Sequence, residues 1–166
     1  MEAVIEGNSL AVGLGEIKVS REPGDVLVAY GLGSCVAVGV YDPLTRVTGL
    51  LHAVLPERTN GADPQCPKYV DSGIAGLLQT VEQLGALRSR LVVRVVGGAN
   101  MLALSSFKQA LNIGERNIAA ARATLSGLRL RVSAEEVGGN KGRTVRLYVA
   151  NGRMNVRVLG SETRDL

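Results

Sequence analysis

The sequence predicts an α/β or α+β fold in which a mixed β-sheet system is flanked by helices. Three observations lead to this prediction. Short apolar runs bounded by turn residues fill the first half of the chain and are typical of buried strands. Two longer segments further along have the residue spacing or composition of helices. The strands outnumber the helices, and the helices follow strands, as in layered folds that combine both elements.

The strands are predicted from alternation and from apolar runs. Residues 16–20 alternate between polar and apolar side chains, and Pro23-Gly24 marks a turn after them. Residues 31–34 are predicted to be a break between the strand at 26–30 and the strand at 35–41. The remaining predicted strands cover 26–30, 35–41, 47–55, 91–96, 128–137, 144–150 and 153–159, and Asn151-Gly152 joins the last two as a hairpin.

Two helices are predicted, at 69–87 and at 112–127. In the first, apolar residues recur at spacings of three and four, which places them on one face. In the second, Asn112 is the expected N-cap, with Glu115 three residues on as in a capping box. Residues 56–68 form a polar loop with three prolines, and residues 99–111 are ambiguous, with a short helical turn considered at 105–111.

Length and composition fit one globular domain with a sizeable core, since 46% of the 166 residues are hydrophobic. The N-terminus lacks the pattern of a secretory signal, and no run reaches the roughly 20 apolar residues of a membrane span. We therefore expect a cytoplasmic protein with no membrane insertion. Two cysteines and one histidine are too few for a typical structural zinc site, so no metal and no cofactor are expected.

The basic balance of the chain does not by itself indicate a nucleic-acid-binding protein. The net charge is +4, but the arginines and lysines are dispersed and aromatic side chains are scarce. A solvated surface explains this pattern better than a nucleic-acid footprint does. An acidic protein partner is compatible with the charge.

Gly31-Leu32-Gly33-Ser34-Cys35 is the most informative segment, because it places a thiol where a glycine-rich loop enters a strand. A dinucleotide-binding motif is excluded, since Val36 stands where the third glycine belongs and no helix pattern follows. Backbone N–H groups around Gly31, Gly33 and Ser34, with that of Cys35, are candidates to bind an oxyanion. The alternative is a buried cysteine that packs as a small hydrophobe, and spacing alone favours it.

His52 is the only histidine and interrupts an apolar strand. It is either a core histidine bonded to backbone or a base for Cys35. A hairpin around Asp42-Pro43 would bring both side chains near its open end. An imidazole can lower the pKa of a thiol from its free value of about 8.5, and the thiolate can then attack a carboxamide. Cys66, between two prolines, has no nearby base and is interpreted as incidental.

Six segments, in this order along residues 12–159, give the chain a resemblance to the CheD family of chemoreceptor glutamine deamidases. They are Gly31–Val38, His52 with Leu55-Pro56, Lys68–Asp71, Gly97–Met101, Asn112–Asn117 and Gly138–Arg143. The resemblance implies one CheD-like domain over residues 1–166, with a motif-bearing core at about 12–159. It also implies a layered sandwich of mixed sheet with helices packed outside, related to bacterial toxin deamidases.

The resemblance implies a hydrolase that converts selected glutamines in the cytoplasmic helices of methyl-accepting chemoreceptors to glutamate, with Cys35 as nucleophile and His52 as base. It further implies that receptor methyl esters are possible substrates and that a CheC-like phosphatase is a possible partner. Two positions depart from the family pattern: Ala29 replaces a threonine thought to orient the histidine, and Leu102 replaces a frequent phenylalanine. Either a backbone carbonyl or another polar group orients His52, or activity is reduced. A non-catalytic chemotaxis adaptor is therefore the alternative function.

Overall fold

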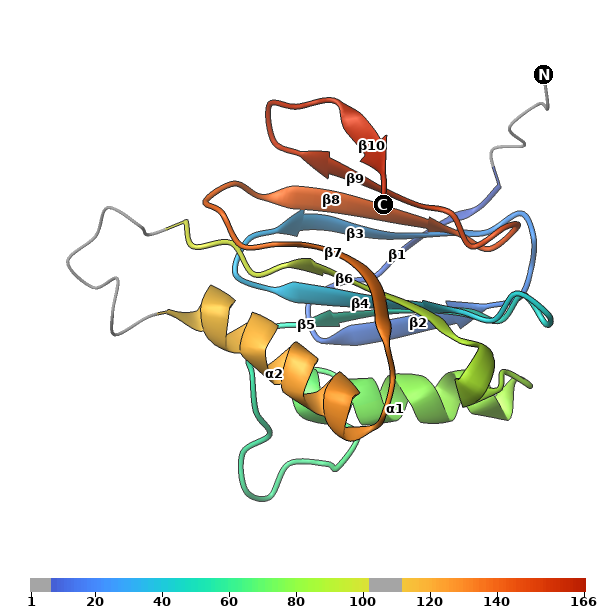
Figure 1. The fold of residues 1–166 in the computed structure, drawn as a ribbon, viewed down its shortest axis with the longest axis horizontal. Helices are drawn as coiled ribbons and strands as arrows, with labels where there is room; N and C mark the ends of the chain where they lie inside the picture. Colours follow the sequence, from blue (N-terminus) through green and yellow to red (C-terminus); the bar gives the residue numbers. More distant parts are fainter. Residues whose placement is uncertain (1–6, 102–111) are drawn as a thin grey trace.

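Two β-sheets pack face to face, and two helices cover the remaining face of one of them, which therefore forms the central layer (Figure 1). The structure is a computed structural model that describes residues 7–101 and 112–166. The outer sheet has the order β1 (Ser9–Ala11), β3 (Val26–Leu32), β8 (Arg143–Tyr148), β9 (Met154–Val158), β10 (Thr163–Asp165). The central sheet has the order β2 (Glu16–Ser20), β5 (Thr48–Ala53), β4 (Val36–Tyr41), β6 (Val92–Gly97), β7 (Val132–Val137).

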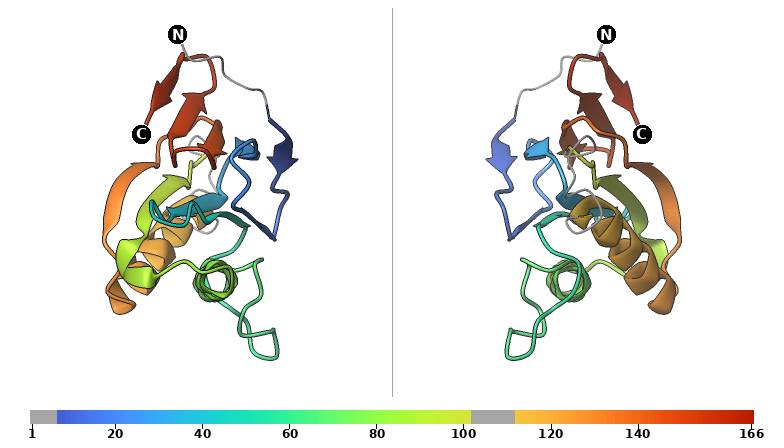
Figure 2. Two further views of the ribbon diagram at one scale, coloured as in Figure 1. Left: turned by 90° about the vertical axis from the view of Figure 1, so that its right-hand side faces the viewer. Right: turned by 90° about the vertical axis from the view of Figure 1, so that its left-hand side faces the viewer.

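Helices α1 (Val70–Gln83) and α2 (Ile113–Gly127) lie on the face of the central sheet that points away from the outer sheet, as the side views in Figure 2 show. A short 3₁₀ turn at Arg88–Arg90 leads into β6. Most strand pairs are antiparallel, but β1 pairs with β3 and β6 pairs with β7 in parallel. The predicted mixed sheets with helices outside are therefore confirmed. The implied relation to bacterial toxin deamidases stays a prediction.

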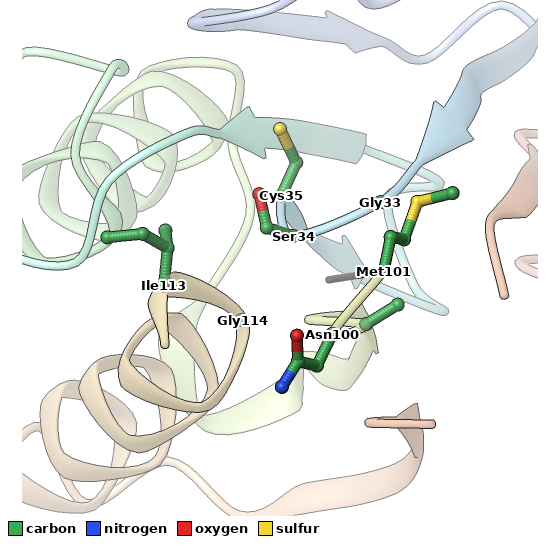
Figure 3. A pocket seen from close by; sticks show the side chains of 8 residues that line it. Gly33, Ser34, Cys35, Asn100, Met101, Ile113 and Gly114 are labelled. Carbon is green, nitrogen blue, oxygen red and sulfur yellow. The ribbon is translucent and has the colours of Figure 1, made fainter. Parts of the chain in front are cut away.

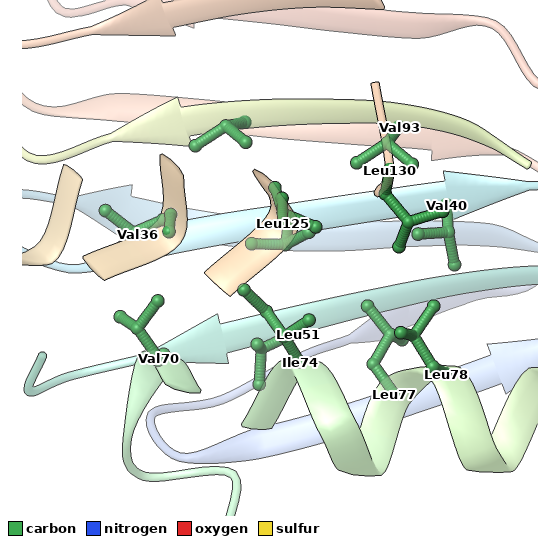
Figure 4. Close-up of a cluster of buried hydrophobic side chains, with 14 of the residues drawn as sticks. Val36, Val40, Leu51, Val70, Ile74, Leu77, Leu78, Val93, Leu125 and Leu130 are labelled. Carbon is green, nitrogen blue, oxygen red and sulfur yellow. The ribbon is translucent and has the colours of Figure 1, made fainter. Parts of the chain in front are cut away.

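Strands β4 and β5 form the middle of the molecule and are buried along their whole length. One hydrophobic cluster fills the space between these strands and the helices, with Leu51 of β5 facing Ile74 and Leu77 of α1 (Figure 4). A second cluster fills the space between the two sheets. Burial on both faces is what apolar runs without alternation predict, and it explains why β4 and β5 were recognisable from the sequence.

Several predicted boundaries need correction. Strand β3 does not end before Gly31 but continues to Leu32, with a bulge between Ala29 and Leu32 and a positive φ of 61° at Gly31. Helix α1 is shorter than predicted and ends at Gln83. Strand β7 begins at Val132 instead of 128, since the chain first turns at the end of α2. Strands β1 and β10 were missed because each has only three residues.

The predicted capping box at α2 is wrong in its details. Asn112 is the N-cap, but its side chain makes no capping hydrogen bond to the helix backbone. Its amide nitrogen instead donates to the carboxylate of Glu115. Leu102 and the turn considered at 105–111 lie outside the described residues, so those predictions are not addressed by the structure.

Asp42 stabilises the turn between β4 and β5 from a fully buried position. Its carboxylate accepts hydrogen bonds from the Arg90 guanidinium at 2.8 Å, from the Leu87 N–H at 3.0 Å and from the Leu44 N–H at 2.9 Å. Arg90 is the main reason that the pKa of Asp42 lies well below its ordinary range, and the two N–H donors add to that effect. The turn is thereby tied to the segment that leads into β6.

We expect Asp42→Ala to lower the free energy of unfolding at pH 7 by about 2–3 kcal/mol, because three donors lose a charged acceptor. The folded-state pKa lies below the unfolded value of about 3.9, so the carboxylate stabilises the fold above that pH and less as pH falls below it. Urea denaturation at pH 7 and pH 3 should therefore show a smaller difference from wild type at pH 3. Asp165→Ala, which removes an exposed partner of Arg153, is the control and should change stability little. An equal loss at both pH values for Asp42→Ala would contradict the assignment.

Candidate active site

The β4–β5 hairpin brings Cys35 and His52 to the same end and the same face of the central sheet. Ala37 of β4 pairs with His52 of β5, and Val36 pairs with Ala53. Because side chains alternate along a strand, Cys35 projects on the same face as Ala37 and therefore on that of His52. The two side chains are diagonal neighbours across the strands, a relation that spans about 7–8 Å between backbone positions. The hairpin predicted from Asp42-Pro43 is confirmed, and both side chains are buried between the sheets.

A backbone carbonyl orients the His52 ring. The Nδ1 atom lies 2.9 Å from the carbonyl oxygen of Val12, so Nδ1 carries the proton that is donated to it. The Gly15 N–H donates to the His52 carbonyl at 2.8 Å, which fixes the backbone of the histidine from the same loop. In a neutral imidazole this arrangement leaves Nε2 as a lone-pair acceptor. Nε2 is buried and has no hydrogen-bond partner among the described residues, Cys35 included.

The loop that carries Cys35 is held by hydrogen bonds from the two residues that follow β6 and from α2. Two backbone N–H groups and one side-chain amide act as donors, and all three acceptors are carbonyl oxygens of the loop. The bonds are Gly98 N–H to Cys35 at 2.8 Å, Ala99 N–H to Gly33 at 2.8 Å and Asn117 Nδ2 to Ser34 at 2.8 Å. Both peptide groups that flank the α-carbon of Cys35 are thereby fixed.

Gly97 is required by this close approach. Its φ of 114° is favourable only for glycine, and an added Cβ would lie 2.3 Å from the carbonyl oxygen of Cys35. A side chain at position 97 would therefore push the loop that carries Cys35 out of place. Gly97-Gly98 belongs to one of the segments that resemble the family; Gly97 permits this close approach, whereas a Cβ on Gly98 would meet the side chain of Ile118 at 2.4 Å.

A pocket of about 450 Å³ lies beside Cys35 (Figure 3). In Figure 3 the Cys35 sulfur lies at the side of this pocket next to β5, the strand that carries His52. Gly33 and Ser34, two of the predicted oxyanion candidates, line the pocket, whereas Gly31 is exposed and does not. The lining residues are Gly33, Ser34, Cys35, Ala99, Asn100, Met101, Ile113 and Gly114. A second pocket of about 340 Å³ shares Ile113 with the first and extends past Tyr69 and Arg116.

Burial raises the pKa of the Cys35 thiol, and the interaction of the thiol with the backbone N–H of Cys35 itself offsets part of that rise. This direction is opposite to the one expected from an imidazole partner. The resting site therefore holds a protonated thiol at neutral pH, since even a free thiol has a pKa of about 8.5. No other described residue forms a hydrogen bond with the Cys35 N–H.

Other parts of the described chain supply no competing site of these kinds. Cys66 lies half-buried in the loop before α1, where its carbonyl accepts a hydrogen bond from Ser72, and it does not line either pocket. The described residues include no cluster of three or more histidine, cysteine or acidic side chains able to hold a metal ion. Within residues 7–101 and 112–166, neither helix is long and apolar enough to cross a membrane.

Asn117 is a residue of the site to which the sequence analysis assigned no role. It belongs to the quoted segment Asn112–Asn117, but a single asparagine in a helix gives no indication of its partner. In the structure it is completely buried, and its amide nitrogen also donates to the carbonyl oxygen of Val54 at 3.0 Å. The sequence feature that could have identified it is a polar residue on the apolar face of α2, between Gly114 and Ala121.

Comparisons with known proteins agree with the resemblance found in the sequence. A family described as CheD chemotactic sensory transduction matches residues 54–158, a range that begins just after the strand carrying His52. Among solved structures, the hypothetical protein YfiH of Bacillus licheniformis aligns with 72% of this chain and 49% of its own, at 18% identity and a TM-score of 0.46.

Two curated relatives extend the similarity over the segment that holds Cys35 and His52. The probable chemoreceptor glutamine deamidase CheD of Symbiobacterium thermophilum is 43% identical over 158 residues, which cover 94% of this chain and 96% of the relative. The protein of the same description from Desulforamulus reducens is 40% identical, with 94% and 95% covered. With a family match over most of its length and such relatives over nearly all of it, the chain belongs to the CheD family.

Proposed function

We propose that this chain is a chemoreceptor glutamine deamidase that hydrolyses glutamine side chains to glutamate and ammonia. The relatives described above carry this activity in their names. The observation that supports it best is the placement of Cys35 and His52 on one face at the open end of the β4–β5 hairpin, beside a pocket. A thiol and an imidazole whose second nitrogen is already held are the parts of a cysteine amidohydrolase.

Acylation begins with a neutral pair in this proposal. Nε2 of His52 takes the proton from the Cys35 sulfur as the sulfur attacks the carbon of the glutamine carboxamide. The new C–S bond converts the carbonyl oxygen into an oxyanion, which the Cys35 N–H is placed to stabilise. The imidazolium then donates its Nε2 proton to the amide nitrogen, the C–N bond breaks, and ammonia leaves a thioester.

Deacylation regenerates the site with one molecule of water. His52 removes a proton from the water as its oxygen attacks the thioester carbon. The imidazolium then returns this proton to the sulfur as the C–S bond breaks, which releases glutamate and restores the thiol and the base. A methyl ester would form the same thioester with methanol as the leaving group, so receptor methyl esters are a second proposed substrate class. Binding of a CheC-like phosphatase and a cytoplasmic location stay predictions of the resemblance.

The non-catalytic adaptor is the weaker candidate. Its motivation was Ala29, which offers no hydroxyl to orient the histidine. The Val12 carbonyl provides this contact instead, and Val12 is itself held by a hydrogen bond from its N–H to the Val28 carbonyl at 2.8 Å. The replacement at position 29 therefore does not leave the base without support.

Cys35→Ser should abolish deamidation. Mass spectrometry of a purified chemoreceptor cytoplasmic fragment incubated with the protein should show a gain of about one dalton per modified site, the difference between the amide and the acid that hydrolysis produces. The variant should give no gain, whereas Cys66→Ser should react like wild type. Full activity of Cys35→Ser would contradict the assigned nucleophile, and no gain with wild-type protein on several receptors would contradict the function.

His52→Gln should lower kcat for deamidation by about 10²–10⁴-fold, because an amide cannot act as a general base. Its shape should preserve the packing between the sheets, which near-UV circular dichroism can check. A kcat near that of wild type would show that another group accepts the thiol proton.

The rate at which iodoacetamide alkylates Cys35 should rise with pH through and beyond neutrality. Because burial raises the pKa of the thiol, the reactive thiolate is a minor species at pH 6 and grows about tenfold per pH unit below that pKa. Stopped-flow alkylation between pH 5 and pH 10, with Cys66→Ser as the background, measures this profile. A rate that is already at its plateau at pH 6 would indicate a thiolate–imidazolium pair instead.

A further inference from the structure

The side chain of Asn117 acts only as a hydrogen-bond donor. Both acceptors are backbone carbonyls close in sequence to the proposed catalytic residues. The Nδ2 atom donates to Ser34, the residue before the nucleophile, and to Val54, two positions after the base. The Oδ1 atom is buried and accepts no hydrogen bond from a described residue. A fully buried amide is costly in a helix face that otherwise packs apolar side chains, and the two donated bonds offset this cost.

The bond to Ser34 determines the direction of the next N–H group. A peptide group is planar and trans, so its C=O and its N–H point in opposite directions. When Asn117 holds the Ser34 carbonyl toward α2, the N–H of Cys35 points away from α2. It has no hydrogen bond to another described residue and is available to a ligand.

We propose that Asn117 is a positioning residue that holds the Ser34–Cys35 peptide so that the Cys35 N–H can bind the oxyanion of the tetrahedral intermediate. This role rests on the proposed deamidation, since only a reaction that forms an oxyanion needs the Cys35 N–H held in this direction. Asn117 does not touch the substrate. It acts through one peptide group, while its second bond keeps the end of β5 at a fixed place beside the loop.

The test compares a step that forms an oxyanion with a step that does not. Asn117→Ala should lower kcat for receptor deamidation by about 10–100-fold. This fall should not exceed the fall in kcat caused by complete removal of one oxyanion-binding donor. KM should stay unchanged, because the substrate-contacting surface is kept. At a pH where the Cys35 thiol is fully ionised, its alkylation by iodoacetamide should proceed at the wild-type rate, since displacement of iodide at a saturated carbon creates no oxyanion. Asn117→Ser, which keeps one shorter donor, should recover part of the lost kcat.

Asn155→Ala is the matched control. Asn155 is also a buried asparagine, its amide nitrogen donates to Tyr148, and its Oδ1 likewise has no hydrogen-bond partner among the described residues, but it lies on β9 of the outer sheet. It should lose stability in thermal unfolding without a selective loss of kcat. The wild-type arm reports on the proposed function separately, since an inactive wild type would refute deamidation and not the role of Asn117 alone.

Three results would overturn the proposal. The first is an unchanged kcat in Asn117→Ala. The second is a fall in alkylation rate that parallels the fall in kcat, which would indicate a displaced loop and not a rotated peptide. The third is failure of Asn117→Ala and Asn117→Ser to fold while Asn155→Ala folds, which would make the amide a structural clamp.

Discussion

The pairing of β4 between β5 and β6 is the constraint on which the rest of the structure depends. Its hairpin partner β5 brings His52 beside Cys35, and its other partner β6 ends in Gly97-Gly98, which lie against the Cys35 carbonyl. Both partnerships are fixed by burial, because β4 packs against helices on one face and the outer sheet on the other. A slip of one residue in the register of β4 against β5 would turn Cys35 to the helix side, away from His52.

Each proposed catalytic residue, or the peptide group next to it, is held by a hydrogen bond to a group outside the hairpin. Val12 follows β1, the edge strand of the outer sheet, and its carbonyl fixes the tautomer of His52. Asn117 comes from α2 on the opposite side of the central sheet. The site is therefore assembled only when all three layers are in place. Such support from several elements is what keeps a catalytic geometry within a few tenths of an ångström of the productive one.

Local patterns explain what the sequence predicted well, and long-range contacts explain what it missed. The hairpin that carries Cys35 and His52 follows from two apolar runs around Asp42-Pro43, so their proximity was predictable. The contact of His52 with the Val12 carbonyl was not predictable, because every residue has a backbone carbonyl and this one lies 40 positions from His52. Asn117 is 83 positions from Ser34, so no spacing rule connects them.

The direction of the Cys35 pKa could not be predicted from the sequence for a related reason. An imidazole can lower the pKa of a thiol, but the sequence does not indicate how deeply the sulfur is buried between two sheets, and burial is the larger effect. In the mechanism proposed above, a protonated Cys35 thiol gives up its proton only as a carboxamide is attacked, so the charge is created together with an acceptor for it. A protonated sulfur also resists oxidation and alkylation, which suits an enzyme whose substrate side chain must be selected before the nucleophile becomes reactive.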